Sequence, residues 1–267
     1  MPAELKTIPA TELTGYGYVH SIYRSTLNFT LNEELFSLQD ARAECSPISF
    51  VLLQGLSLPL CRAGQPASWD GTTLRLGDAA FSCSHETERF SGELPAARNP
   101  VLPEGFALPA LNGDFGGSRQ SAAEAEAVTQ RAAAAMACGN WKQAASELCG
   151  MLGLGCGLTP SGDDWLIGAL ALLQFAAEKN AACLQLLHAM QGALLPQLSE
   201  TNDISARFLE LACEKRFSAP VCTLFSAWLG GDAAAVCRAA RRVLRLGHSS
   251  GADMLEGIRF MYNHLFC

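Results

Sequence analysis

The chain has 267 residues, of which 49% are hydrophobic and 17% charged, with 19 lysines and arginines against 26 aspartates and glutamates. Because disordered chains combine low hydrophobicity with high net charge, this composition excludes intrinsic disorder and leaves enough apolar residues for a sizeable core. The net charge of -7 excludes nucleic acid as a main partner, since such proteins need a basic face for phosphates. The length predicts one or two domains.

Neither a membrane span nor a secreted disulfide framework is expected. The longest apolar run, residues 165–177, is shorter than the roughly 20 residues of a span. Residues 1–17 lack the apolar core of a signal peptide. The 11 cysteines are odd in number and include no C-x-x-C pair. They therefore predict reduced thiols in a cytoplasmic protein.

The first part of the chain, residues 1–95, is expected to form a β-rich domain. Short runs of β-branched and aromatic residues alternate there with turn residues, and the strand candidates are residues 16–23, 48–53 and 80–84. Residues 69–76 predict a hairpin, because Asp70-Gly71 favours the positive φ of a tight turn. Several short strands at this spacing predict a small barrel or sandwich.

A proline- and glycine-rich connection, residues 96–117, follows this domain, and helix formers dominate from there to the end. Predicted helices cover residues 121–137, 141–151, 166–178, 181–195, 205–216, 220–229, 232–246 and 253–266. Residues 166–178 are apolar on every side, which predicts a buried central helix. The predicted fold class is α+β, with an N-terminal small β-barrel or sandwich domain and a C-terminal all-α helical bundle over residues 118–267.

A glycine-serine-aspartate motif occurs twice in the α domain. The first copy reads GLGCGLTPSGDDWLIG from Gly153 to Gly168, and the second reads GHSSGADMLEG from Gly247 to Gly257. When Ser161 is aligned with Ser250, SGDDWLIG and SGADMLEG agree at five of eight positions. The motif is therefore a short internal repeat of an element that leads from a loop into a helix.

The repeat has a structural and a functional interpretation. Ser161 with Asp164, and Ser250 with Asp253, have the S-x-x-D spacing of a capping box, and each aspartate suits the positive end of a helix dipole. Capping does not explain the three glycines before Ser161 or the additional Asp163. Glycines before a helix leave N–H groups accessible to an anion. Two such helix starts that face each other would form a pocket for a phosphate or carboxylate.

Three aspartates, Asp163, Asp164 and Asp253, are the candidates for catalysis, and they could also hold Mg²⁺ beside an anionic ligand. Helix capping is the simpler alternative. The P-loop signature is absent because no lysine follows Gly162 at the required place. The candidates for ligand binding are Gly155, Gly157, Thr159, Ser161, Gly162, Thr201, Asn202, Ser205, Arg207, Ser249, Ser250 and Gly251.

The segment from Thr201 to Ser205 belongs to this set because it precedes a predicted helix that carries Arg207. An ordinary N-cap accounts for the segment. In the functional interpretation its side chains contact a ligand, and the guanidinium of Arg207 is available for a carboxylate or phosphate. Arg24 and Asn28 are similar candidates in the β domain.

The motif of residues 153–168 resembles the signature of the oxamate carbamoyltransferase subunit family of anaerobic allantoin catabolism, the AllH-type subunit. Residues 201–205 and 247–257 resemble the same family in order and approximate spacing, so the resemblance covers roughly residues 150–260. It implies a multi-subunit enzyme that exchanges a carbamoyl group between oxalurate plus phosphate and oxamate plus carbamoyl phosphate. The implied partners are the other subunits and these small anions, which suit helix N-termini and free amides.

One departure from other carbamoyltransferases is visible. The S-T-R-T loop of the aspartate and ornithine enzymes is absent, since Ser25-Thr26 is followed by Leu27. Carbamoyl transfer here would therefore use a different site. Two alternatives stay open: a non-catalytic scaffold or binding subunit, and a Mg²⁺-dependent phosphate-handling enzyme that uses the three aspartates. The low charge and a helical row of arginines favour the scaffold, and the row comprises Arg238, Arg241, Arg242 and Arg245.

Overall fold

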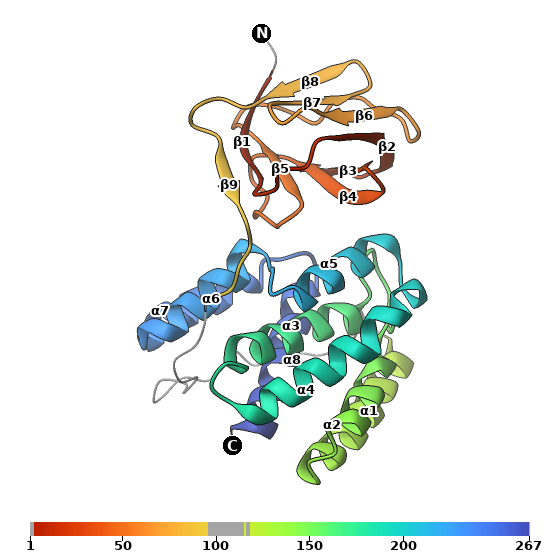
Figure 1. The fold of residues 1–267 in the computed structure, drawn as a ribbon, viewed down its shortest axis with the longest axis vertical. Helices are drawn as coiled ribbons and strands as arrows, with labels where there is room; N and C mark the ends of the chain where they lie inside the picture. Colours follow the sequence, from red (N-terminus) through yellow and green to blue (C-terminus); the bar gives the residue numbers. More distant parts are fainter. Residues whose placement is uncertain (1–2, 96–114, 116–117, 267) are drawn as a thin grey trace. The chain divides into compact units, whose positions relative to one another are not determined.

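The computed structural model describes residues 3–95, 115 and 118–266, and it divides the chain into two compact units between Gly92 and Glu93. Strands occupy the first unit and helices the second (Figure 1). The α+β fold class is therefore confirmed. The predicted proline- and glycine-rich connection, residues 96–117, lies outside the described residues except for Phe115.

The first unit is an eight-stranded β-barrel with one additional strand. The strands pair in the order β5-β4-β3-β2-β6-β7-β8-β1, and β1 also pairs with β5, which closes the barrel. β9 pairs in parallel with the end of β1. The strands are β1 (Ala3–Pro9), β2 (Gly15–Ile22), β3 (Thr26–Leu31), β4 (Glu34–Gln39), β5 (Ser49–Leu52), β6 (Pro66–Trp69), β7 (Thr73–Leu76), β8 (Ala79–Ser82) and β9 (Glu88–Phe90).

Aromatic side chains fill the barrel. Alternate residues of a strand point to one face, and this places Phe29, Phe36 and Phe50 together with ring centroids 5.6 to 6.1 Å apart. Trp69 completes the cluster, with its ring 5.1 Å from that of Phe50. The predicted hairpin is confirmed, since β6 and β7 are antiparallel on either side of a turn in which Gly71 has a φ of 95°.

The second unit is a helical bundle. Its elements are α1 (Arg119–Ala137), α2 (Trp141–Leu148), η2 (Cys149–Met151), α3 (Ser161–Ala176), α4 (Ala181–Leu194), η3 (Leu195–Glu200), α5 (Asp203–Cys213), α6 (Ala219–Gly230), α7 (Ala233–Val243) and α8 (Ser250–Leu265). Every residue of α3 is buried, which confirms the predicted central helix. α3 packs against α4, α5 and α8. No described helix combines the length and apolar composition that crossing a membrane needs.

The helix starts differ from the prediction at both copies of the repeat. α3 begins at Ser161, and Pro160 is its N-cap residue without a side-chain cap; α8 begins at Ser250 after Ser249, also without one. The two predicted capping boxes are therefore wrong. Each serine is the first residue of its helix, because the preceding turn already positions the backbone, and its hydroxyl is left for other contacts.

Glycines allow α3 and α8 to pack backbone against backbone. A Cβ on Gly168 would lie 1.9 Å from the carbonyl oxygen of Met254, and a Cβ on Gly257 would lie 2.0 Å from that of Trp165. The contacts are reciprocal, since each glycine is the eighth residue of its helix and each carbonyl belongs to the fifth. The repeated motif therefore corresponds to a repeated structural element, and its two copies pack on each other.

Candidate functional site

The first turns of α3 and α8 lie side by side. The hydroxyl oxygens of Thr159, just before α3, and Ser250, the first residue of α8, are 3.2 Å apart. The reciprocal glycine contacts follow two turns further along each helix. Because α3 and α8 touch at their starts and again two turns later, the two helices run in the same direction. Their N-termini are therefore adjacent. Their positive dipole ends therefore lie at one place on the helical unit.

Asp164 lies directly behind these two hydroxyls. Its Oδ2 accepts a hydrogen bond of 2.8 Å from Thr159 Oγ1, and its side chain is 2% exposed. Burial raises the pKa of Asp164 to about 7, against the lowering effect of the hydrogen bonds from Ser250 and Thr159. Repulsion from Asp253 and Asp163 raises this pKa further. The carboxyl group of Asp164 is therefore close to half-protonated at neutral pH.

Asp163 joins three segments of the chain. Its Oδ1 accepts a 2.7 Å hydrogen bond from the N–H of Gly153, and its Oδ2 accepts one from the hydroxyl of Thr201, just before α5. Burial raises the pKa of Asp163, while the hydrogen bonds from Gly153 and Thr201 lower it. Since both oxygens bind the protein itself, Asp163 holds the glycine loop and the start of α5 in place.

Ser161 is a buried polar group that the fold leaves unsatisfied. Its side chain is fully buried, and its hydroxyl has no hydrogen-bond partner among the described residues. A Cβ built on Gly155 would lie 3.5 Å from Ser161 Oγ, so the hydroxyl faces the glycine loop. Buried hydroxyls in proteins are nearly always bonded, and an unsatisfied one calls for an explanation. A ligand that enters between the loop and α3 would provide the partner.

The glycine loop, residues 153–159, presents backbone to the solvent. Gly153, Gly155 and Gly157 have φ values of 70°, 106° and 124°, which side chains rarely adopt. The segment from 156 to 158 is exposed, with Thr159 half-buried behind it. The loop thus provides the close backbone approach that an anion site requires.

The second copy of the repeat is built similarly on α8. Gly247 has a φ of 57°, and a Cβ there would lie 2.8 Å from Ser250 Oγ, so this glycine also lies against the serine that opens its helix. Ser249 and Ser250 are half-buried, whereas Gly251 and Asp253 are buried. In the first copy Gly162, the counterpart of Gly251, donates its N–H to the carbonyl of Leu154. The N–H of Gly162 is therefore not available to a ligand.

The start of α5 is an ordinary N-cap with one link to the site. Asn202 Oδ1 accepts hydrogen bonds of 3.1 Å from the N–H groups of Ile204 and Ser205, and Thr201 reaches Asp163. Arg207 forms an ion pair of 2.8 Å with Glu210 on its own helix. The capping interpretation of this segment therefore holds, and Thr201 connects it to α3.

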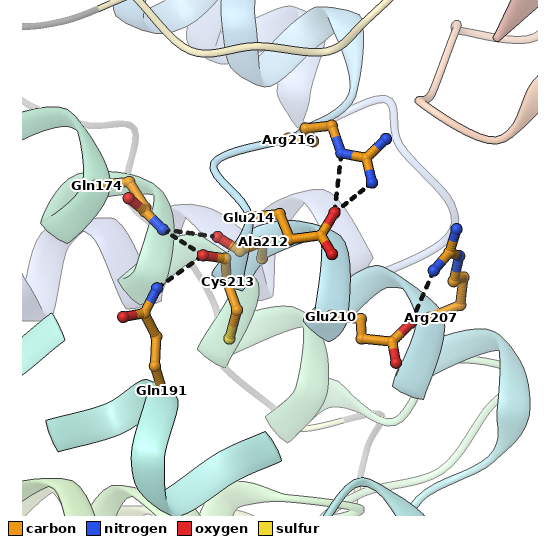
Figure 2. A network of polar contacts seen from close by, with 8 residues as sticks. All are labelled: Gln174, Gln191, Arg207, Glu210, Ala212, Cys213, Glu214 and Arg216. Atoms are coloured by element: carbon orange, nitrogen blue, oxygen red, sulfur yellow. Dashed lines mark hydrogen bonds and ion pairs between the residues drawn. The ribbon is translucent and has the colours of Figure 1, made fainter. Parts of the chain in front are cut away.

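Glutamines fix the other end of α5, as Figure 2 shows. Gln174 of α3 donates to the carbonyls of Ala212 and Cys213 at 3.2 and 2.8 Å, and Gln191 of α4 donates to that of Cys213 at 2.7 Å. These carbonyls belong to the last turn of the helix, where the regular backbone hydrogen bonds run out, and that of Ala212 also accepts from the N–H of Lys215. α5 is thus held at its start by Asp163 and at its end by two amide side chains.

The three aspartates do not form a metal site. In the part of the chain that the structure describes, no group of three or more His, Cys, Asp or Glu side chains is arranged to hold a metal ion. Both oxygens of Asp163 are already bonded to Gly153 and Thr201. The geometry therefore does not support the magnesium interpretation.

Several other residues singled out in the sequence belong to other elements of the chain. Arg24 and Asn28 belong to the barrel unit, where Asn28 donates a 3.1 Å hydrogen bond to Ser21. Arg238 and Arg241 on α7, and Arg245 just after it, are exposed, as a solvated face requires. A docking role for that face stays a prediction.

The helical unit also has a cavity of about 710 Å³, which no sequence motif had indicated. It lies beside α1 and α8, and its wall includes Trp165, Phe260, Arg119, Arg259 and His264. Arg259 is already paired with Glu256. Four separate segments of the chain line this cavity, so no local pattern in the sequence could have identified it.

The comparison with known protein families concerns the helical unit, which carries this site. The family model for the oxamate carbamoyltransferase subunit AllH matches residues 151–262, which include the glycine loop, α3, α5 and most of α8. Among the curated proteins and the solved structures, none matches the chain. Residues 151–262 therefore match the family that the motifs predicted, that of oxamate carbamoyltransferase subunit AllH.

Proposed function

We propose that the chain is a subunit of an oxamate carbamoyltransferase and that it binds small anions where the N-termini of α3 and α8 meet. The family match over residues 151–262 supports the first part. The unsatisfied hydroxyl of Ser161 carries the second part, because it is a buried donor that faces the glycine loop without a partner among the described residues. The adjacent positive ends of the two helix dipoles favour negative charge there.

The ligands of this reaction fit such a site. Oxalurate and oxamate carry a carboxylate, carbamoyl phosphate and phosphate carry phosphoryl oxygens, and all of them are small. In the exchange, a phosphate oxygen attacks the terminal carbamoyl carbon of oxalurate, the bond from that carbon to the oxamate nitrogen breaks, and the nitrogen takes up a proton. Negative charge develops on the carbonyl oxygen during the attack, and preorganised N–H and O–H donors stabilise it.

The candidate residues then have distinct roles. Thr159, Ser161, Ser249 and Ser250, with the N–H groups of the loop around Gly155 and Gly157, contact the ligand. Asp164 and Asp253 lie behind them and orient these groups, and Asp163 positions the loop. The other subunits of the assembly are partners in this proposal, and the free cysteines of the described residues fit a cytoplasmic location.

Binding of oxamate and inorganic phosphate to the Ser161→Ala variant tests the anion site. Loss of a hydrogen bond to a charged ligand costs about 1.5–3 kcal/mol, so the affinity should fall roughly 10- to 100-fold. Ser218→Ala is the matched control, because the hydroxyl of Ser218 also lacks a partner among the described residues but lies at the start of α6.

Isothermal calorimetry on both variants, with a melting curve for each, separates binding from folding. Equal loss of affinity in Ser161→Ala and Ser218→Ala would contradict the site. Formation of carbamoyl phosphate from oxalurate and phosphate, measured with the other subunits present, tests the assignment to the enzyme. A lone chain with full turnover would contradict its role as a subunit.

A further inference from the structure

Two hydroxyl groups and one carboxyl group form a continuous chain from the half-buried surface into the protein. Thr159 Oγ1 donates to Asp164 Oδ2 at 2.8 Å and lies 3.2 Å from Ser250 Oγ, so Ser250 is joined to Asp164 through Thr159. Thr159 and Ser250 are half-buried, whereas Asp164 is buried. A ligand can therefore reach the two hydroxyls while the carboxyl group stays behind them.

The protonation of Asp164 decides which way the hydroxyl protons point. Each hydroxyl has one proton to donate. When Asp164 is ionised, Thr159 donates its proton to Asp164 and Ser250 donates its proton to Thr159, so only lone pairs face a ligand. When Asp164 carries a proton, it can donate to one of these oxygens, and that hydroxyl is then free to donate outward to an anion.

We propose that an anion bound at Thr159 and Ser250 is taken up together with one proton, which is held on Asp164. The inference deepens the proposed function and rests on it, since it specifies how that site admits its anionic ligand. The proton comes from solvent and enters the carboxylate of Asp164, and no covalent bond changes.

The electrostatic surroundings favour this coupling. The charged groups that act on Asp164 are Asp253, from the first turn of α8, and Asp163, its neighbour on α3, and both are acidic. An ionised Asp164 therefore adds to the negative charge around the site, and this charge repels an incoming anion. Neutralising it removes that repulsion and provides a donor. Independently of these three hydrogen-bonded groups, the buried unsatisfied hydroxyl of Ser161 faces the glycine loop and indicates a ligand there.

The test uses oxamate and sulfate as probes, since both stay fully ionised between pH 6 and 8.5. Calorimetric titrations in buffers of different ionisation enthalpy give the number of protons taken up per anion. We expect uptake to approach one proton at pH 8.5 and the affinity to fall about tenfold per pH unit above pH 7 to 7.5. In Asp164→Asn the amide can donate at every pH, so uptake should vanish and affinity at pH 8.5 should exceed that of the unchanged protein at least tenfold.

Asp203→Asn is the matched control, because Asp203 is exposed in the first turn of α5, and this variant should keep the full uptake. Thr159→Val with Ser250→Ala is a second test that leaves Asp164 in place, and its affinity should be low and independent of pH. Binding of either probe to the unchanged protein without proton uptake overturns the coupling but leaves the anion site. Absence of binding by both probes from pH 6 to 8.5 overturns the anion site and the coupling with it.

Discussion

The hydroxyl oxygens of Thr159 and Ser250 lie 3.2 Å apart although 91 residues separate them in the sequence. Each residue lies in one copy of a repeated motif, next to the start of its helix, and the two helices pack through reciprocal glycine contacts. The repeat therefore serves two purposes. Its glycines bring α3 and α8 into backbone contact, and its hydroxyl and carboxyl groups are thereby gathered at the adjacent helix starts.

Replacement of Gly168 by alanine should weaken the whole helical unit. The new Cβ would lie 1.9 Å from the backbone carbonyl of Met254, and backbone cannot move aside as a side chain can. We expect a loss of at least about 2 kcal/mol in the free energy of unfolding, measured by urea denaturation. Gly192→Ala is the control, since a Cβ there meets nothing within 4 Å and should stabilise α4 by about 0.5–1 kcal/mol. Equal midpoints for the two variants would contradict the packing argument.

Asp163→Asn should loosen the glycine loop. The carboxylate accepts from the N–H of Gly153 and from the hydroxyl of Thr201, and an amide can accept through only one of its two atoms. A cost of about 1–3 kcal/mol is expected, with faster amide exchange at residue 153. The comparison variant is Asp203→Asn, at an exposed position, where a change within about 0.5 kcal/mol is expected. Unchanged exchange in Asp163→Asn would show that the loop is held by other contacts.

The buried carboxyl group of Asp164 should make stability fall as pH rises. Its pKa is raised from 3.8 to about 7. Between these values the folded chain keeps a proton that the unfolded chain has lost, so the free energy of unfolding decreases from about pH 4 to 7 and then levels off. At 1.36 kcal/mol per unit, the total is on the order of 4 kcal/mol.

Asp164→Asn removes this titration, so its unfolding free energy should depend less on pH than that of the unchanged protein. Some dependence should remain, because the pKa of Asp163 is also raised by burial. Urea unfolding at pH 5, 6, 7 and 8 for both proteins gives the two curves. Parallel curves would mean that Asp164 ionises normally in the folded state.

Replacement of Gln174, which bonds the last turn of α5, should lower the free energy of unfolding more than replacement of an exposed glutamine. Gln174 is buried and donates to the carbonyls of Ala212 and Cys213, so Gln174→Met removes two buried hydrogen bonds, although Gln191 still donates to Cys213. We expect a loss of about 1–3 kcal/mol in the free energy of unfolding. Gln197→Met, which removes an exposed bond to Ala193, should change stability by less than about 0.5 kcal/mol. Thermal melting of both variants gives the comparison.

Local patterns predicted the helices better than the strands. The eight predicted helical segments all correspond to observed helices, because their periodic apolar faces and the caps between them are readable locally. The hairpin of β3 and β4 was missed. Its turn residues, Asn32 and Glu33, both have positive φ, as in a type I′ turn, but no glycine marks the place.

The sequence by itself determined the order of a β part and an α part, the buried character of α3 and the repeated motif with its family resemblance. Only the tertiary structure decided what the motif does. It made Ser161 a buried unsatisfied hydroxyl instead of a cap, gave Asp163 its partners Gly153 and Thr201, and joined Thr159 to Ser250. Local patterns report the conformation of a few neighbouring residues. Contacts across some ninety residues depend on which faces pack together, and here that is set by glycines whose effect appears only when two helices meet.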